Sequence, residues 1–370
     1  MAADALAARP RTLAEGWDSG RNNFNLLRLV AAWLVIYGHA WAISGTPGGD
    51  LIAQLTQLKF AGGVAVDVFF VISGFLIAAS LQRNSLRNYV VSRALRILPG
   101  LAACVLLSVL VLGPLLTTSA DYWQPQAWRY FWVNASLWSN EYFLPGVFET
   151  LPNHAINGSL WTLPIEARLY LALMFAGAFG LLTARRYTPL WLLALGSAYA
   201  YAVYRHPLPD ALSNYTWCTA YFITGTALWL NRARVRLSWI ALLVLVIVAA
   251  FARGKPWFHV PYFVLVCYGT LFLAFVPPLP RIRHHDLSYG LYLYGWPSGQ
   301  LVQQFSPGGP LHNTFWATLL ALVLAAASWF LVERPAMALK RRLGTRTPKA
   351  APDLASAVAP TPSPLSSRTE

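Results

Sequence analysis

The sequence predicts an all-α, polytopic membrane protein with about ten transmembrane helices. Of its 370 residues, 56% are hydrophobic and only 11% are charged. Several apolar runs exceed the roughly 18 residues that a spanning helix requires. The first 20 residues lack the apolar core of a cleavable signal, so the run that begins at Leu26 is expected to be retained as the first span. These observations exclude a soluble protein.

Ten apolar segments are predicted to cross the membrane. They lie at residues 24–43, 60–81, 97–116, 159–182, 189–204, 212–230, 238–252, 258–276, 288–305 and 313–333. With the N-terminus in the cytoplasm, the predicted inner segments hold 21 Lys and Arg residues and the outer ones hold five. Because Lys and Arg favour cytoplasmic loops, both termini are predicted to be cytoplasmic, N-in and C-in. This bias also explains the net charge of +14, so no nucleic-acid partner is expected.

One folded unit is predicted between two tails. Residues 1–22 are assigned to a cytoplasmic N-terminal tail and residues 23–335 to the transmembrane domain. Residues 336–370 are assigned to a largely disordered cytoplasmic tail, because Pro, Ser, Ala and Thr cannot bury a core. The outer segment 117–158 is rich in aromatic residues, which suit an interfacial belt or stacking on sugar rings.

Charged residues within the predicted spans are the strongest sign of function. Four of them lie clearly inside a span, namely Arg28, Asp67, Glu166 and Arg168. A charge in hydrocarbon costs roughly 2.5 to 3.5 kcal/mol, so each implies a partner or a function. His39 follows Arg28 by eleven positions, which returns to within about 20° of the same helix face about 16 Å further along. Arg28 and His39 are therefore expected to face one interior at different depths.

His39, Asp67 and Glu166 are predicted to share one level in the outer half of the membrane. Counted along the spans, Asp67 lies about 10 Å deep, Glu166 lies at a similar depth, and His39 lies near the outer end of its span. A neutral imidazole oriented by a carboxylate commonly removes a proton from a hydroxyl. A polar network that only holds helices together is an equal alternative.

Arg93 and Arg96 lie three residues apart at the predicted cytoplasmic mouth of the third span. They share a helix face, and two guanidinium groups that point the same way can bind phosphates bidentately. Taken alone, such a pair more often indicates arginines that anchor a helix at the inner leaflet.

Six motifs in order resemble the acyltransferase-3 family, integral-membrane enzymes that O-acylate extracytoplasmic glycans from a cytoplasmic acyl-CoA. The motifs are Arg28-x10-His39, residues 63–77, Arg93-Ala-Leu-Arg96, residues 157–166, residues 287–294 and Glu333-Arg-Pro335. The resemblance runs from about Asn23 to Pro335. One departure is Gly295, because many members have a His before the aromatic residue and Pro that follow the late Tyr motif.

The resemblance implies an acyl-CoA-dependent O-acyltransferase, by default an O-acetyltransferase, in the bacterial inner membrane. Acetyl-CoA or another acyl-CoA is the expected co-substrate, with its phosphates on Arg93 and Arg96, helped by Arg28. The expected acceptor is a glycan or a lipid-linked saccharide. Membrane lipids are the remaining expected partner, and no metal is required.

The resemblance also assigns roles within the interior. His39 is expected to act as general base on a sugar hydroxyl, or to hold the acyl group briefly. Glu166 or Asp67 would orient its ring or polarise the acceptor. Trp161 and Tyr292 are assigned to substrate binding.

Two alternatives to this assignment stay open. A proton-coupled transporter or a lipid or glycan flippase would use His39, Asp67 and Glu166 as a proton relay. Inverted repeats and paired broken helices would support it, and the sequence shows neither. Ser73 is a candidate covalent acyl carrier, although a Ser beside Gly74 is more often a helix-packing residue.

Overall fold

The computed structural model describes residues 11–180, 182, 210–280, 282 and 285–339, and within them the chain is helical without strands. The predicted span at 189–204 lies outside these residues. Five of the described helices are long and apolar enough to cross a membrane, namely Phe24–Ser44, Ala61–Arg83, Leu86–Leu116, Pro256–Phe275 and Pro310–Ala338. The all-α membrane fold is thus confirmed, whereas ten spans and the N-in, C-in orientation stay predictions.

The helices follow the predicted spans with one clear shift. Their bounds are α1 Leu13–Asp18, α2 Phe24–Ser44, α3 Leu51–Thr56, α4 Ala61–Arg83, α5 Leu86–Leu107, α6 Gly113–Leu116, α7 Pro125–Ala135, α8 Thr162–Ala178, α10 Asp210–Leu230, α11 Trp239–Ala252, α12 His259–Phe275, α13 Ser288–Phe305, α14 Pro310–Ser328 and α15 Arg334–Ala338. Two π-helical turns, η2 Ser108–Leu112 and η6 Trp329–Glu333, join α5 to α6 and α14 to α15. The 3₁₀ turns η3 Gly158–Trp161 and η5 Pro256–Phe258 precede α8 and α12.

The shift concerns the third span, predicted at 97–116. Its helix begins at Leu86, because the Ser85 side chain accepts a hydrogen bond from the Asn88 backbone N–H and caps the helix. Arg93 and Arg96 therefore lie within α5, about two to three turns from its first residue.

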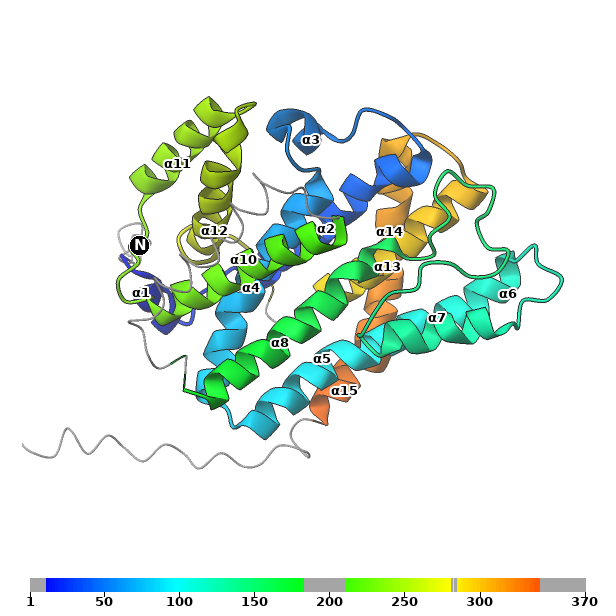
Figure 1. Cartoon of the computed structure of the whole chain (residues 1–370), viewed down its shortest axis with the longest axis horizontal. Coiled ribbons are helices and arrows are strands. Elements are labelled where there is room, and N and C mark those ends of the chain that lie inside the picture. Colours follow the sequence, from blue (N-terminus) through cyan, green and yellow to red (C-terminus); the bar gives the residue numbers. More distant parts are fainter. Residues whose placement is uncertain (1–10, 181, 183–209, 281, 283–284, 340–370) are drawn as a thin grey trace, which may run out of the picture.

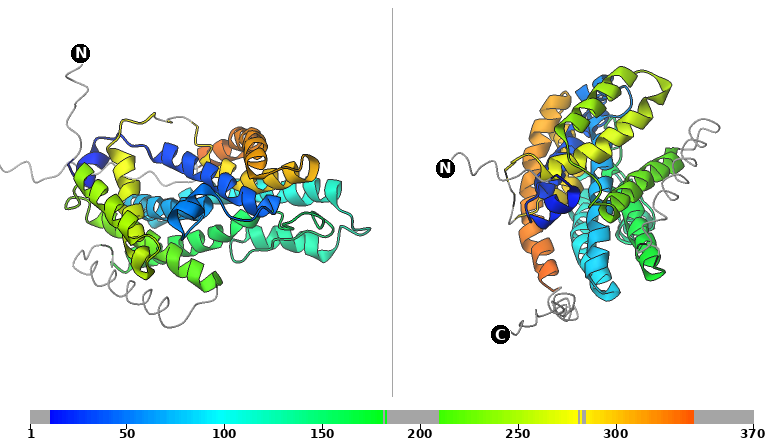
Figure 2. Two further views of the ribbon diagram at one scale, coloured as in Figure 1. Left: turned by 90° about the horizontal axis from the view of Figure 1, so that it is seen from above. Right: turned by 90° about the vertical axis from the view of Figure 1, so that its left-hand side faces the viewer.

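Helix α4 lies at the centre of the molecule (Figure 1). It packs against α2, α8, α10 and α12, while α13 packs against α2 and α14. The other views show α10, α11 and α12 gathered at one end and α6 and α7 at the other (Figure 2). Side chains that reach the centre from α2, α8 and α13 therefore meet beside α4.

Two glycine contacts allow α10 to approach α4 closely. A Cβ atom on Gly74 would lie 2.0 Å from the Phe222 carbonyl oxygen, and one on Gly225 would lie 2.3 Å from the Val71 carbonyl oxygen. Small residues at such crossings let membrane helices gain van der Waals contact between backbones. Gly74 is thus required for packing, whatever the role of its neighbour Ser73.

The segment that precedes α2 packs against the helical domain. Leu13 is fully buried, and its backbone N–H donates to the Val235 carbonyl at 3.0 Å. The Trp17 and Trp229 rings meet edge to face, with 4.9 Å between their centroids. Part of the predicted N-terminal tail therefore covers the loop after α10.

Replacing Gly74 with Ala is expected to destabilise the protein, because the new methyl group overlaps the Phe222 carbonyl. Overpacking of this kind costs about 1 to 3 kcal/mol, so the melting temperature in detergent is expected to fall. Gly269→Ala is the matched control, since its Cβ would meet no atom closer than 3.7 Å. Equal melting temperatures for the two variants would contradict this account of α4 packing.

Candidate active site

A cavity lies between α2, α4, α8 and α13 and encloses about 500 Å³, including its open mouth. Its walls are formed by Arg28, Val66, Phe69, Phe70, Ser73, Thr162, Leu163, Glu166, Ser288, Tyr289 and Tyr292. Three of the residues predicted from the sequence, Arg28, Glu166 and Tyr292, therefore line the same space. Most of the α4 side is apolar, and the other helices supply most of the polar groups.

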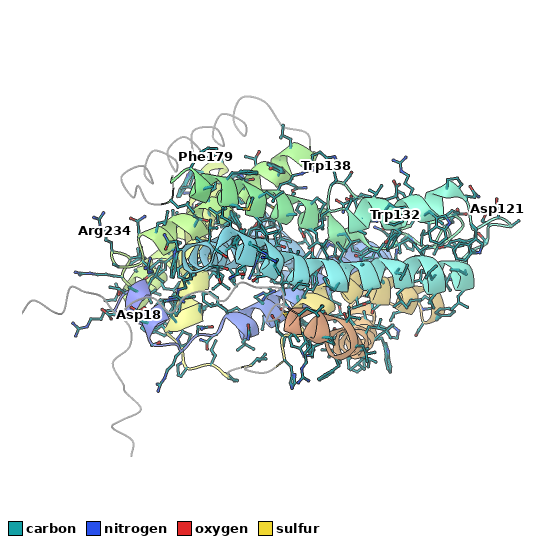
Figure 3. The ribbon with its side chains drawn as sticks, turned by 90° about the horizontal axis from the view of Figure 1, so that it is seen from below. Asp18, Asp121, Trp132, Trp138, Phe179 and Arg234 are labelled. Carbon is teal, nitrogen blue, oxygen red and sulfur yellow. The ribbon has the colours of Figure 1, made fainter. Side chains whose placement is uncertain are left out.

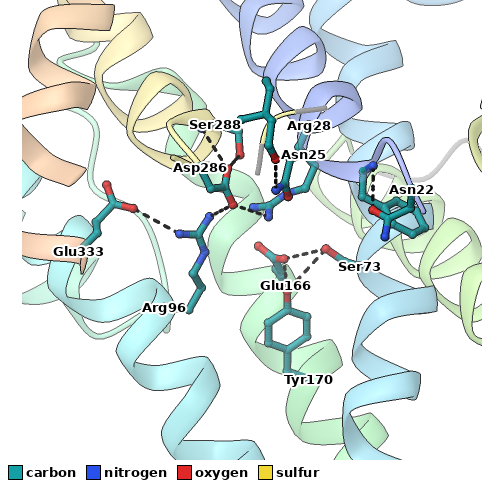
Figure 4. Close-up of polar contacts among 12 residues, drawn as sticks. Asn22, Asn25, Arg28, Ser73, Arg96, Glu166, Tyr170, Asp286, Ser288 and Glu333 are labelled. Atoms are coloured by element: carbon teal, nitrogen blue, oxygen red, sulfur yellow. Dashed lines mark hydrogen bonds and ion pairs between the residues drawn. The ribbon is translucent and has the colours of Figure 1, made fainter. Parts of the chain in front are cut away.

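An arginine cluster (Arg28, Arg96, Asp286 and Glu333) adjoins this cavity (Figure 4). Arg28 Nη1 and Arg96 Nη2 both donate to Oδ2 of Asp286, at 3.0 and 2.6 Å. Arg96 Nη1 also lies 3.5 Å from Oε2 of Glu333. The hydroxyl and the backbone N–H of Ser288 donate to the other Asp286 oxygen. Helices α2 and α5 are thus joined through one carboxylate.

Asp286 is not among the site residues predicted from the sequence, because it falls between two predicted spans and not within one. Burial alone would raise the pKa of its carboxyl group, but the Arg28 and Arg96 guanidinium groups and the Ser288 hydrogen bonds hold that pKa below its ordinary value. The one available signal was its position directly before the motif at 287–294.

Arg93 differs from Arg28 and Arg96 in its ion pairing. None of the ion pairs formed by the described residues includes Arg93. Its Nε atom is buried and has no hydrogen-bond partner among the residues that the structure describes. An unsatisfied buried donor on a charged group is costly, and an anion such as a phosphate would satisfy it.

Glu166 lies in the cavity wall and accepts two hydrogen bonds (Figure 4). One comes from the Ser73 hydroxyl at 2.9 Å and the other from the Tyr170 hydroxyl. Ser73 also lines the cavity, so its hydroxyl is oriented by a carboxylate at an open surface.

Asp67 belongs to a separate cluster, which corrects the expected meeting with His39 and Glu166. Its carboxylate is fully buried and accepts from Lys59 Nζ at 2.6 Å, Trp217 Nε1 at 2.8 Å and the Tyr262 hydroxyl at 2.9 Å. These partners lie before α4 and on α10 and α12. Counting residues gives the depth of a side chain but not the neighbour that its helix face meets.

His39 is oriented by the backbone rather than by a carboxylate. Its Nδ1 lies 2.7 Å from the Val35 carbonyl oxygen. Because a carbonyl only accepts, Nδ1 must hold the proton, and Nε2 of the neutral ring has a free lone pair. Among the described residues Nε2 has no hydrogen-bond partner. The Phe60 and Trp296 rings flank the imidazole, with centroids 5.1 and 4.8 Å from its own.

His39 lies about one helical turn beyond the cavity on two independent helices. On α4 its Cε1 approaches Gly62, where a Cβ atom would lie 3.1 Å away, and the first cavity residue of α4 is Val66. On α13 it contacts Trp296, and the last cavity residue is Tyr292. Four residues of helix correspond to about 6 Å. The arginine cluster and His39 thus flank one space.

Glycines allow the helices around His39 to approach each other. A Cβ atom on Gly38 would lie 2.5 Å from the Gly62 backbone nitrogen, and one on Gly295 would lie 2.6 Å from Cγ1 of Ile36. The departure from the family pattern at Gly295 therefore has a steric reason. A His side chain at position 295 would collide with Ile36 on α2, the helix that also carries His39.

The two residues assigned to substrate binding lie in different places. Tyr292 lies in the cavity wall, and its hydroxyl lies 2.5 Å from the Thr162 hydroxyl and donates to the Ser159 carbonyl. Trp161 does not line this cavity and instead borders a second hollow with Trp138 and Arg168.

The membrane helices enclose a charged internal site, and comparison with known proteins identifies the family. Residues 21–334 match the family described as an acyltransferase domain, so the chain belongs to the acyltransferase-3 family.

Two of three similar proteins have names that describe acyl transfer. The chain is 29% identical to "O-acetyl transferase" of Shigella phage Sf6, over 85% of this chain and 95% of that protein. It is 29% identical to "Nodulation protein 10" of Rhizobium leguminosarum bv. viciae, over 88% of this chain and 96% of that protein. It is 26% identical to "Putative membrane-bound transacylase BcsY" of Komagataeibacter xylinus, over 87% of this chain and 84% of that protein. No solved structure gives a significant match.

Removing the shared carboxylate with Asp286→Asn is expected to lower stability by about 3 kcal/mol at neutral pH, because two partly buried guanidinium groups lose the charge that they share. Since the folded-state pKa of Asp286 is depressed, its stabilisation is present above the ordinary Asp pKa and is lost as pH falls through the lowered value. Melting temperatures of wild type and variant, measured against pH, should therefore converge in acid. Asp121→Asn, at an exposed site, is the control. Identical wild-type and Asp286→Asn melting at neutral pH would contradict the structural role of the cluster.

Proposed function

We propose that this membrane acyltransferase moves an acyl group, most simply acetyl, from acyl-CoA to a hydroxyl of an extracytoplasmic or lipid-linked glycan. Family membership and the relative named transacylase support acyl transfer, and the relative named O-acetyl transferase supports an oxygen acceptor. The observation that carries the mechanism is the His39 ring, whose Nδ1 contact with the Val35 carbonyl leaves Nε2 as a free base.

In the proposed reaction His39 Nε2 removes the proton of the acceptor hydroxyl as its oxygen attacks the thioester carbonyl. The new C–O bond forms and the C–S bond breaks, so the electron pair of the C–S bond leaves on the CoA sulfur. The imidazolium then returns the proton to that thiolate. The Phe60 and Trp296 rings exclude water from one side of the base.

The donor is proposed to enter the cavity from the arginine side. Arg93 is the most suitable phosphate ligand, because it has an unsatisfied buried N–H and no ion pair among the described residues. Arg28 and Arg96 are held in place by Asp286 and retain further N–H donors. The acyl-pantetheine arm would then extend along the apolar α4 wall towards His39.

Glu166 and Asp67 receive different roles in this proposal. Glu166 shapes the cavity and orients the Ser73 hydroxyl. Asp67 is a positioning residue, since its ion pair holds Lys59, which directly precedes Phe60 beside the imidazole. A proton relay through His39, Asp67 and Glu166 is disfavoured, because the partners of Asp67 lie on α10, on α12 and before α4 rather than beside His39.

His39→Ala is expected to reduce acyl transfer by about 10² to 10⁴, because it removes a general base. Turnover of detergent-purified enzyme, monitored by release of free CoA thiol with acceptor glycan present, gives the rate at matched protein level. His312→Ala is the control, because His312 is exposed and its ring interacts with Ser306 and lies near the Trp316 ring. Wild-type turnover by His39→Ala would remove His39 from the mechanism.

Arg93→Ala is expected to weaken acyl-CoA binding at least tenfold, because a charge-assisted hydrogen bond is worth about 1.5 to 3 kcal/mol. Arg93→Lys should recover only part of the affinity, since Lys offers a point charge instead of a planar fork. Calorimetry with acetyl-CoA measures both, with Arg87→Ala, an exposed change on the same helix, as control. If Arg93→Ala binds acetyl-CoA as tightly as the wild type does, Arg93 is a membrane anchor instead. If the wild type itself binds no CoA, the result would favour the alternative of a transporter.

A further inference from the structure

A second hollow lies on the opposite face of α8 from the active-site cavity. It encloses about 940 Å³, including its open side, and is called the α8 groove here. Its walls are formed by Trp138, Ser139, Asn140, Tyr142, Trp161, Pro164, Ile165, Arg168, Asn214 and Tyr215. Most of these residues come from the segment before α8 and from α8 itself.

The groove combines flat aromatic faces with uncharged polar groups. Four of its residues are aromatic, Trp138, Tyr142, Trp161 and Tyr215, and the Trp138 side chain is 73% exposed. Asn140, Asn214 and Ser139 add amide and hydroxyl groups. A sugar ring presents C–H faces that pack on aromatic rings and hydroxyl edges that pair with amides. An interfacial aromatic belt explains the rings but not this concave set of polar groups.

Arg168 is the charged residue of the groove wall, and it lies within a helix where an unpaired charge is costly. One of its N–H groups donates to the Trp138 carbonyl, and its guanidinium carbon lies 5.2 Å from the centroid of the Trp138 ring. The described residues offer no partner for its other donors. The guanidinium therefore both orients Trp138 and keeps N–H groups for a neutral or acidic ligand.

The groove is connected to His39 through two packed rings. Tyr142, in the groove wall, packs against the small cluster of Ile43, Ala155 and Trp296. The Trp296 ring in turn contacts the His39 imidazole, with 4.8 Å between centroids. The Tyr142 and Trp296 rings thus lie between a ligand in the groove and the proposed base.

We infer that the α8 groove binds the saccharide acceptor, with Trp138 and Trp161 as stacking surfaces and Arg168 as the hydrogen-bonding group. This rests on the proposed function for the acceptor being a glycan. The donor occupies the cavity on the other face of α8, so the two substrates approach His39 from opposite sides of one helix.

The test measures binding of the full-length, detergent-purified protein to an array of neutral and acidic bacterial oligosaccharides, followed by calorimetry with the best-bound one. Trp138→Ala and Arg168→Ala are each expected to lower its affinity at least tenfold while acetyl-CoA affinity stays unchanged. Trp132→Ala is the matched control. Trp132 is also exposed, at 67%, but does not line the groove, and it lies well apart from Trp138 (Figure 3).

The outcomes separate this inference from the proposed function. Absence of any oligosaccharide binding, undiminished affinity in both groove variants, or an equal loss in Trp132→Ala would overturn the groove assignment, even if acetyl-CoA binds normally. Saccharide binding that depends on Trp138 and Arg168, in a protein that binds no acetyl-CoA, would support the groove and reject the proposed donor.

Discussion

The ion pairs of Asp286 are the interaction on which the charged interior depends. Arg28 on α2 and Arg96 on α5 share one of its oxygens, and without it two like charges would face each other in a low-dielectric interior, where an unpaired charge is expensive. The shared oxygen fixes α2 along its axis, since Arg28 cannot slide without breaking the pair. His39, eleven residues further along the same helix, is fixed in depth by the same contact.

Close helix packing fixes the other coordinates of His39. Gly38 and Gly62 bring α2 against the start of α4. Asp50 is fully buried there and accepts from the backbone N–H groups of Ala53 and Ala61, at 2.9 and 2.8 Å. It therefore caps α3 and α4 together and holds Phe60 against the imidazole. The ring is set by glycines, a cap and a backbone carbonyl, which explains how the site orients a base without a carboxylate partner.

The sequence predicted what depends on periodicity and on local motifs. The helical membrane fold, the cavity position of Arg28 and the family all follow from apolar runs, an eleven-residue spacing and ordered motifs. It did not predict that Asp67 pairs with Lys59 instead of meeting His39, because helix depth is local but the facing helix is a property of tertiary packing. Asp286 was missed for a related reason. It lies outside any span, and only the folded chain brings it between two arginines.

The two faces of α8 suggest how the substrates meet. Glu166 and Arg168 are two positions apart, about 200° around the helix, and they line the cavity and the groove respectively. In the proposed reaction the body of α8 would separate donor from acceptor, and the two would meet near its N-terminal end. There η3 packs on the active-site wall, since a Cβ atom on Gly158 would lie 2.5 Å from the Trp296 ring, and Trp296 contacts His39. The Trp296 ring thus links η3 at this end of α8 to His39, and a base at this point would serve the acceptor hydroxyl and the thioester alike in the proposed reaction.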